Sequence, residues 1–134
     1  MQVSTADDDG GVVGLDSCAL TEVDPGRVAA AKEALISTDD ADDLAACFRL
    51  LGDPKRVRIL YALLEAGELC VCDIAAAVDI SETTVSQAMR LLRTAGIVRN
   101  RRAGRMVYYR LDDAHVRLLL DVSKEHVVRE GTRQ

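Results

Sequence analysis

Two cysteines separated by one residue are the part of the sequence best suited to chemistry, in the run Glu68-Leu69-Cys70-Val71-Cys72-Asp73. Side chains two positions apart on a regular helix diverge by about 200°, so both sulfurs can face one ion only where a helix begins. The pair lies at the start of a short alanine-rich helix, whose N-terminus also stabilises the thiolates that bind metal. The spacing therefore predicts a metal site at Cys70 and Cys72. The alternative is a pair of small buried apolar residues.

A two-thiolate site is incomplete, because closed tetrahedral sites take four ligands. Cys18 is the candidate for a further ligand, since it lies in an acidic N-terminal segment with Glu22 nearby; the alternative is a free thiol. Soft thiolates select Cd(II), Pb(II) or Zn(II) over hard cations, and no organic cofactor is expected. Cys47 is different, because it shares an apolar stripe with Leu44 and Leu51 and is expected in the core.

A second group of candidate ligands, Asp113, His115 and His126, lies on the last predicted helix. The two histidines are eleven residues apart, so they share a helix face but lie about 16 Å apart along the axis. Two antiparallel copies of the helix bring Asp113 and His115 of one subunit to His126 of the other. The pattern predicts a homodimer with two equivalent sites. The alternative is a pair of interfacial histidines without metal.

Charge is distributed unevenly along the 134 residues, whose formal net charge is −5. Residues 1–43 carry eleven acidic and two basic side chains, a net of −9, whereas residues 44–134 carry eleven and fifteen, a net of +4. Between Ser86 and Arg110 there are seven arginines and no acid. Solvated surfaces normally mix both signs, so this stretch predicts nucleic-acid contact; a merely solvated basic surface is the alternative.

Composition excludes other classes of protein. No apolar run approaches the roughly 20 residues of a membrane span, and the N-terminus lacks the basic and apolar regions of a secretory signal. We therefore expect a cytoplasmic protein with reduced cysteines and no membrane partner. Three tyrosines and one phenylalanine are too few to favour single-stranded nucleic acid, which is bound by base stacking.

Apolar spacing and capping signals predict a mostly α fold with one β-hairpin. Helices are expected at about 27–35, from a cap at 37–40 to 51, and at 54–66, 68–78, 82–95 and 114–129; strands are expected at 97–101 and 106–111. The expected buried stripes are Val57, Leu60, Tyr61 and Leu64 on the third helix, and Val85, Met89 and Leu92 on the fifth. Residues 1–24 are expected to form a mobile acidic arm, and residues 25–134 a winged helix-turn-helix domain.

The run from 68 to 95 has the layout of a helix-turn-helix, with a tight turn at 79–81 and Ser81 as N-cap. The second helix of this motif enters the major groove of double-stranded DNA, where polar side chains read base edges. The outward side chains are Thr83, Thr84, Ser86, Gln87 and Arg90. The hairpin arginines, which would meet phosphate or the minor groove, are Arg101, Arg102 and Arg105.

Three segments in this order resemble the ArsR/SmtB family of metal-sensing repressors: CFRLLGDPKRVRILYALLEAGELCVCDIA, DISETTVSQAMRLLRTAGIVRNRRAGRMVYYRL and DAHVRLLLDVSKEH. The resemblance covers about two thirds of the chain, from Leu44 to His126. It implies a winged-helix homodimer assembled through its N- and C-terminal helices. It also implies that the metal-free dimer binds an operator and that metal releases it. Ala88 departs from the family, which often carries histidine there, so a DNA contact at that position is in doubt.

The resemblance also implies two ligand sets. The box at 68–73 is similar to that of the cadmium- and lead-sensing, CadC-like branch, where the arm of one subunit supplies two cysteines, four residues apart, to the pair on the other. The arm positions correspond to Cys18 and Glu22, so the implied first site is Cys70, Cys72, Cys18 and Glu22. The last helix is similar to the family's zinc-sensing pattern. Arg129 stands at the expected fourth position and Glu130 follows it, so the implied second site is Asp113, His115, His126 and Glu130.

These features predict a metal-responsive transcriptional repressor and not an enzyme. A cysteine nucleophile needs a nearby base, and the only two histidines lie on the last helix. Arsenic-sensing members carry a further cysteine where this chain has Ala75, which disfavours arsenite, although Cys18 could supply a third sulfur. The alternatives are an arsenite-responsive repressor, a thiol-redox-responsive one, and a winged helix used for protein contact.

Overall fold

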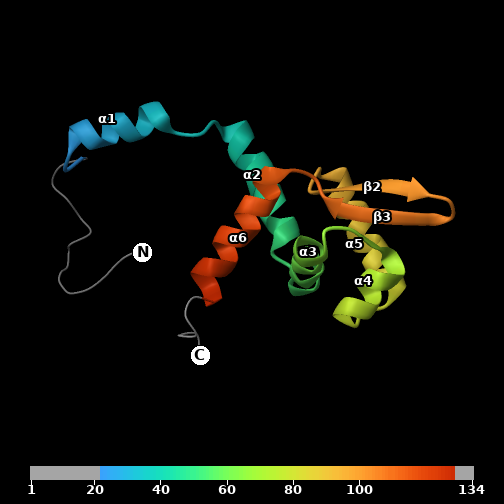
Figure 1. Cartoon of the computed structure of the whole chain (residues 1–134). Coiled ribbons are helices and arrows are strands. Elements are labelled where there is room, and N and C mark those ends of the chain that lie inside the picture. Colours follow the sequence, from blue (N-terminus) through green and yellow to red (C-terminus); the bar gives the residue numbers. More distant parts are fainter. Residues whose placement is uncertain (1–21, 129–134) are drawn as a thin grey trace. The chain divides into compact units, whose positions relative to one another are not determined.

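The computed structural model describes residues 22–128 and contains six helices and three short strands within them (Figure 1). The helices are α1 Pro25–Ala34, α2 Thr38–Leu51, α3 Pro54–Ala66, α4 Val71–Val78, α5 Glu82–Thr94 and α6 Ala114–Val128. The strands are β1 Leu69–Cys70, β2 Val98–Ala103 and β3 Met106–Leu111. The chain divides into two compact units, Met1–Ala41 and Asp42–Gln134. Helix α1, which buries none of its residues, belongs to the first unit.

The core of the second unit is formed by α3, α4 and α5 together with the base of the sheet. On α3 the fully buried side chains are Ile59, Leu60 and Leu63. Of the stripe predicted for this helix, Leu60 is fully buried, Tyr61 and Leu64 are half-buried and pack against the core, and Val57 is half-buried; the prediction missed Ile59 and Leu63. The reason is that α3 has neighbours on two sides, packing against α4 and β3 as well as against α6. A single periodic stripe does not describe a helix that is covered from two directions.

The helix-turn-helix is formed as predicted by α4, a tight turn and α5. Asp79 ends α4 in the left-handed conformation, with φ of 57°, and Ser81 caps α5 by accepting a 3.1 Å hydrogen bond from the Thr84 amide. The buried face of α5 carries Val85, Ala88, Met89 and Leu92 at helical spacing. This confirms the predicted inward residues and adds Ala88. The Ala88 side chain is packed in the core, so it does not face outward toward DNA.

A third strand joins the predicted hairpin, in the sheet order β1-β3-β2. Residues 69–70, expected at the start of a helix, are extended and pair antiparallel with β3, so that Leu69 lies opposite Tyr109 and Cys70 opposite Tyr108. The hairpin strands extend to Ala103 and reverse through Gly104, whose φ is 62°. In β2 only Val98 is buried, so the hairpin projects from the core (Figure 1).

One hydrogen bond ties α6 to α3. The Tyr61 hydroxyl donates to the carbonyl oxygen of Leu120 at 2.6 Å, and the Lys124 ammonium lies 5.9 Å from the centre of the Tyr61 ring. Burial, with a smaller contribution from the charge of Asp121, raises the pKa of the Tyr61 hydroxyl. The contact holds the C-terminal helix against the domain.

We expect Tyr61→Phe to lower the free energy of unfolding by about 1 kcal/mol, because the Leu120 carbonyl loses its donor. A hydroxyl with a raised folded-state pKa stabilises the fold fully below its ordinary value of 10.0, and this stabilisation is lost as pH rises through the folded pKa. The wild type should therefore lose more stability than the variant above pH 10 in urea unfolding. Parallel loss in both proteins across that range would contradict this role.

Candidate functional site

Three potential metal ligands meet where β1 passes into α4. The Sγ atoms of Cys70 and Cys72 are 3.3 Å apart, and ligand atoms of Cys70, Cys72 and Asp73 all lie within 4.8 Å of one another. Cys70 is the N-cap of α4 in extended conformation, whereas Cys72 and Asp73 are in its first turn. This break from the helix lets both sulfurs face one point, as predicted. Asp73 was not predicted as a ligand, although its place beside Cys72 in the first turn was a usable signal.

The donor set fits a soft or borderline divalent cation. Tetrahedral zinc with Zn–S bonds of 2.3 Å requires sulfurs about 3.8 Å apart, so the 3.3 Å pair needs only a small separation. The expected helix-terminus stabilisation of the thiolate does not dominate at Cys72: its hydrogen bond with Cys70, followed by desolvation and nearby negative charge, raises the pKa of the Cys72 thiol. A bound cation reverses this balance, because a coordinating thiol is deprotonated outright.

The remaining predicted ligands of this site belong to the first unit, whereas Cys70 and Cys72 belong to the second. Cys18 lies outside the described residues, and Glu22 is exposed in the first unit. Cys47 is half-buried and packs against the core, in agreement with its predicted structural role.

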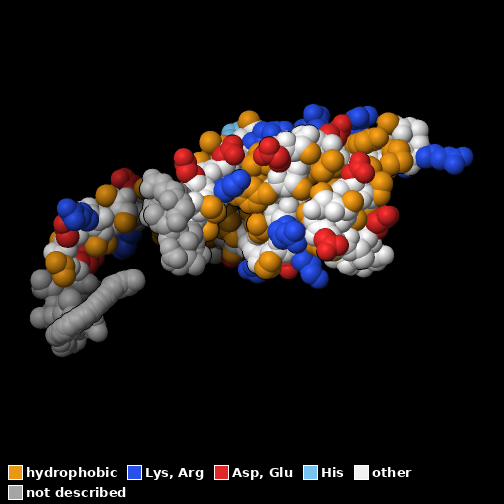
Figure 2. Space-filling model, turned by 60° about the horizontal axis from the view of Figure 1, so that its bottom comes forward, with side chains coloured by type: hydrophobic (Ala, Val, Ile, Leu, Met, Phe, Trp, Pro, Cys, Tyr) orange, Lys and Arg blue, Asp and Glu red, His pale blue; other side chains and the backbone are white. Residues whose placement is uncertain are grey.

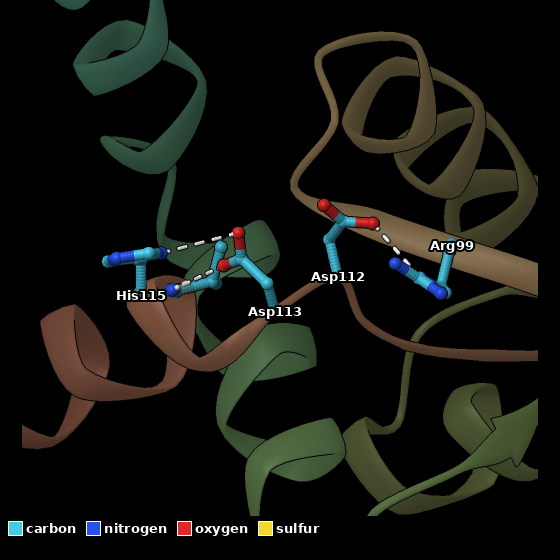
Figure 3. Close-up of polar contacts among 5 residues, drawn as sticks. Arg99, Asp112, Asp113 and His115 are labelled. Atoms are coloured by element: carbon cyan, nitrogen blue, oxygen red, sulfur yellow. Dashed lines mark hydrogen bonds and ion pairs between the residues drawn. The ribbon is translucent and has the colours of Figure 1, made fainter.

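The second predicted site begins at the N-terminus of α6. Asp113 Oδ2 lies 3.5 Å from His115 Nδ1, and the His115 side chain is 94% exposed (Figure 3). A hydrogen bond from the Val116 amide, assisted by His115, lowers the pKa of the Asp113 carboxyl. His126 is exposed farther along α6, and Glu130 lies outside the described residues. Of the members of this set that lie within residues 22–128, Asp113 and His115 are the two that one chain brings together.

The outer face of α5 carries the predicted base-contacting residues. Thr83, Gln87 and Arg90 are exposed, while Thr84 and Ser86 are half-buried. Thr84 is held back because its hydroxyl accepts a 2.9 Å hydrogen bond from Ser81 as part of the helix cap. Gln87 and Arg90 are therefore the best placed of the five to reach outward.

The hairpin arginines fall into two kinds. Arg102 and Arg105 are exposed and have no ion pair within residues 22–128, and basic side chains occupy the tip of the projecting hairpin (Figure 2). Arg101 instead forms two 2.9 Å hydrogen bonds with the carboxylate of Glu68, a residue that the sequence did not single out. This contact lowers the pKa of the Glu68 carboxyl. Arg99 makes a single contact with Asp112, from Nε to Oδ1 at 3.0 Å (Figure 3).

An apolar groove of about 520 Å³ lies between α2, α3 and α6 in the second unit. Phe48, Tyr61 and Leu119 are among its lining residues. Phe48 is 55% exposed and Leu119 40%, and further large apolar residues of α6 are exposed, namely Leu118, Val122, Val127 and Val128. Leu118 and Val122 are not among the residues that line the groove. A groove lined by exposed apolar side chains is typical of a protein–protein interface. No described helix is long and apolar enough to cross a membrane.

Comparison with known proteins agrees with this architecture. Residues 53–100 match the family described as bacterial regulatory protein, arsR family. A cadmium resistance transcriptional regulatory protein CadC homolog from Staphylococcus aureus is 40% identical over 111 residues, 83% of this chain and 91% of the relative. The crystal structure of the antimony-specific repressor AntR superposes with a TM-score of 0.66 at 33% identity, over 75% of this chain and 89% of that one.

A homodimeric winged helix-turn-helix DNA-binding domain from Mycobacterium bovis is also similar, with a TM-score of 0.61 at 30% identity, over 75% of this chain and 99% of that one. The structure contains the helix-turn-helix and the hairpin of a winged helix. The similarity to transcriptional regulators extends over most of the length of those relatives, and it agrees with this architecture. The protein belongs to the ArsR family of winged helix-turn-helix transcriptional regulators.

Proposed function

We propose that this protein is a transcriptional repressor whose metal-free homodimer binds operator DNA and is released by Cd(II), Pb(II) or Zn(II). The observation that carries the proposal is the Cys70–Cys72–Asp73 cluster at the start of α4, the helix that opens the DNA-binding motif. Soft thiolates select these metals, and the similarity to a cadmium resistance regulator supports the choice of cadmium as the first probe.

The groove between α2, α3 and α6 is proposed to take a second copy of the chain. Dimerisation there would cover Phe48 and the exposed face of α6, and would place two α5 helices to enter successive major grooves about 34 Å apart. The similarity to a homodimeric domain supports this arrangement. The operator is then a palindrome with one half-site for each subunit.

The proposed ligand sets extend beyond what one chain's described residues supply. Cys18 and Glu22 from the partner's arm are proposed to complete the site at Cys70 and Cys72, with Asp73 as a competing oxygen ligand. Asp113 and His115, with His126 and Glu130 of the partner subunit, are proposed as a second site across the dimer. Both sets bind only after their protons are displaced, so metal occupancy competes with protons.

The test uses reduced, metal-free protein to select duplexes from a random-sequence pool, followed by titration of the enriched duplex with and without Cd(II). We expect tight binding without metal, weakened binding with Cd(II), and a thiolate-to-metal charge-transfer band that rises with release. Equal affinity with and without Cd(II), Pb(II) and Zn(II) would contradict metal-responsive repression. All titrations use one salt concentration, because phosphate contacts make affinity salt-dependent.

The 3.3 Å contact between the two sulfurs also favours a second candidate, a thiol-redox response. A peroxide could oxidise both thiols to a disulfide and be reduced to water, so atoms and electrons balance. Release by hydrogen peroxide without metal, reversed by dithiothreitol, would support this candidate. Release by Cd(II) in the presence of reductant would favour the metal response.

We expect the double variant Arg102→Ala with Arg105→Ala to lower the affinity for operator DNA and for non-operator DNA by a similar factor. If each arginine neutralises one phosphate, the dimer loses four contacts and the slope of log affinity against log salt shrinks by about 3 to 4. Fluorescence anisotropy at several salt concentrations measures the slope. An unchanged slope would place the hairpin away from the phosphates.

A further inference from the structure

The ion pair between Glu68 and Arg101 joins the hairpin to the segment that carries the thiols. Arg101 Nε and one terminal guanidinium nitrogen each lie 2.9 Å from a different oxygen of Glu68. The guanidinium also lies 4.8 Å from the centre of the Tyr108 ring. Two hydrogen bonds and a ring contact hold this cation against the sheet, although its side chain remains 55% exposed.

The sheet places this ion pair on the same face as a metal-binding thiol. Tyr108 on β3 lies opposite Cys70 on β1 and opposite Arg101 on β2. Directly paired residues project to the same face, and neighbouring strands are about 4.8 Å apart, so Cys70 and Arg101 lie two strand spacings apart across Tyr108. Glu68 precedes Cys70 by two residues, the period at which an extended chain returns to the same face.

The Arg101 guanidinium has two possible anionic partners, the Glu68 carboxylate and a DNA phosphate. While Nε and one terminal nitrogen donate to Glu68, the carboxylate neutralises the guanidinium and only its other terminal nitrogen is left without a partner on Glu68, so the contact with a phosphate is much weaker than for a free Arg101. Any condition that fixes residues 68–72 in the observed conformation therefore withdraws one cation per subunit from DNA. Metal ligation by Cys70 and Cys72 is such a condition, since both ligands lie within this segment.

We propose that Glu68 is the positioning residue that couples the thiolate site to DNA release, by holding Arg101 off the operator phosphates when metal is bound. In the metal-free complex Arg101 leaves Glu68 for a phosphate. In the metal-bound protein it stays on Glu68 and Tyr108. This proposal rests on the proposed metal-responsive function, and it adds how occupancy of the site reaches the hairpin.

The test compares wild type with Glu68→Gln, which retains the size of the side chain but loses its charge. Operator affinity is measured at several salt concentrations, with and without Cd(II). For the wild type, Cd(II) should lower the affinity and shrink the slope of log affinity against log salt by about 2, one phosphate contact per subunit. In Glu68→Gln the slope should be the same with and without Cd(II), and the affinity loss caused by Cd(II) should be at least about fivefold smaller.

Asp112→Asn is the matched control, because it removes the Arg99 ion pair from the same strand without touching residues 68–72. It should keep the wild-type response to Cd(II), whereas Glu68→Gln should not. The charge-transfer band at one Cd(II) per thiolate pair should be the same in all three proteins. A Glu68→Gln variant that responds like the wild type overturns the coupling, and so does one that no longer binds Cd(II). A wild type that ignores Cd(II), Pb(II) and Zn(II) overturns the proposed function itself.

Discussion

Replacing both cysteines of the pair, Cys70→Ser with Cys72→Ser, is expected to leave operator binding intact and to abolish its response to Cd(II). The sulfurs lie 3.3 Å apart at the start of α4, the first helix of the helix-turn-helix. They are not on the outer face of α5, so their loss should leave the DNA-contacting residues in place. Serine hydroxyls are hard and poorly acidic, so they do not replace thiolates as ligands for a soft cation. Allosteric coupling between two sites typically changes affinity 5- to 150-fold, and the variant should lose all of that change.

The measurement is the ratio of operator affinities without and with Cd(II), at one salt concentration and in the presence of reductant. Cys47→Ser is the matched control, because Cys47 packs against the core and lies outside the cluster. Cys47→Ser should keep the wild-type ratio, whereas the double variant should have a ratio of one. A double variant that releases DNA on Cd(II) as well as the wild type does would show that effector binding takes place elsewhere. The pair Asp113 and His115 would then become the first candidate.

Placing charge in the apolar groove, Phe48→Glu with Leu119→Glu, is expected to give a folded monomer that binds the operator at least about 100-fold more weakly. Both side chains are substantially exposed in the single chain, at 55% and 40%, so glutamate is tolerated there without a partner. In a dimer the same positions would bury four carboxylates in an apolar interface, which is strongly unfavourable. Two linked half-sites commonly bind 10²- to 10⁴-fold more tightly than one, and the monomer forfeits this gain.

Sedimentation gives the oligomeric state, circular dichroism confirms that the helices remain, and anisotropy gives the operator affinity. The conservative pair Phe48→Leu with Leu119→Val keeps the groove apolar and should remain dimeric with nearly wild-type affinity. If the glutamate variant stayed dimeric, the second copy would have to dock elsewhere on the chain. A monomer that kept full operator affinity would instead argue against one half-site for each subunit.

Local signals were sufficient to predict most of the helices. The Asp53-Pro54 start, the Ser81 cap and the glycine that ends α3 act within a few residues of the chain, and each is found where it was expected. The inward face of α5 was likewise predictable, because that helix buries a single stripe. The stripe of α3 was not, since its burial depends on neighbours from two directions that are distant in sequence.

The sequence by itself determined the helix-turn-helix with its hairpin, the proximity of Cys70 to Cys72, and the basic composition of the DNA-facing half. Each depends on residues close together in the chain, where capping, periodicity and charge act directly. Only the tertiary structure decided that residues 69–70 form a strand, that Asp73 joins the two sulfurs, and that Arg101 pairs with Glu68. The strand and the Arg101 contact depend on pairing with β3 and on residues up to 33 positions apart, which local preference does not set. Asp73 is local, but its carboxylate reaches the sulfurs only because the chain leaves the strand at Cys70 and begins α4.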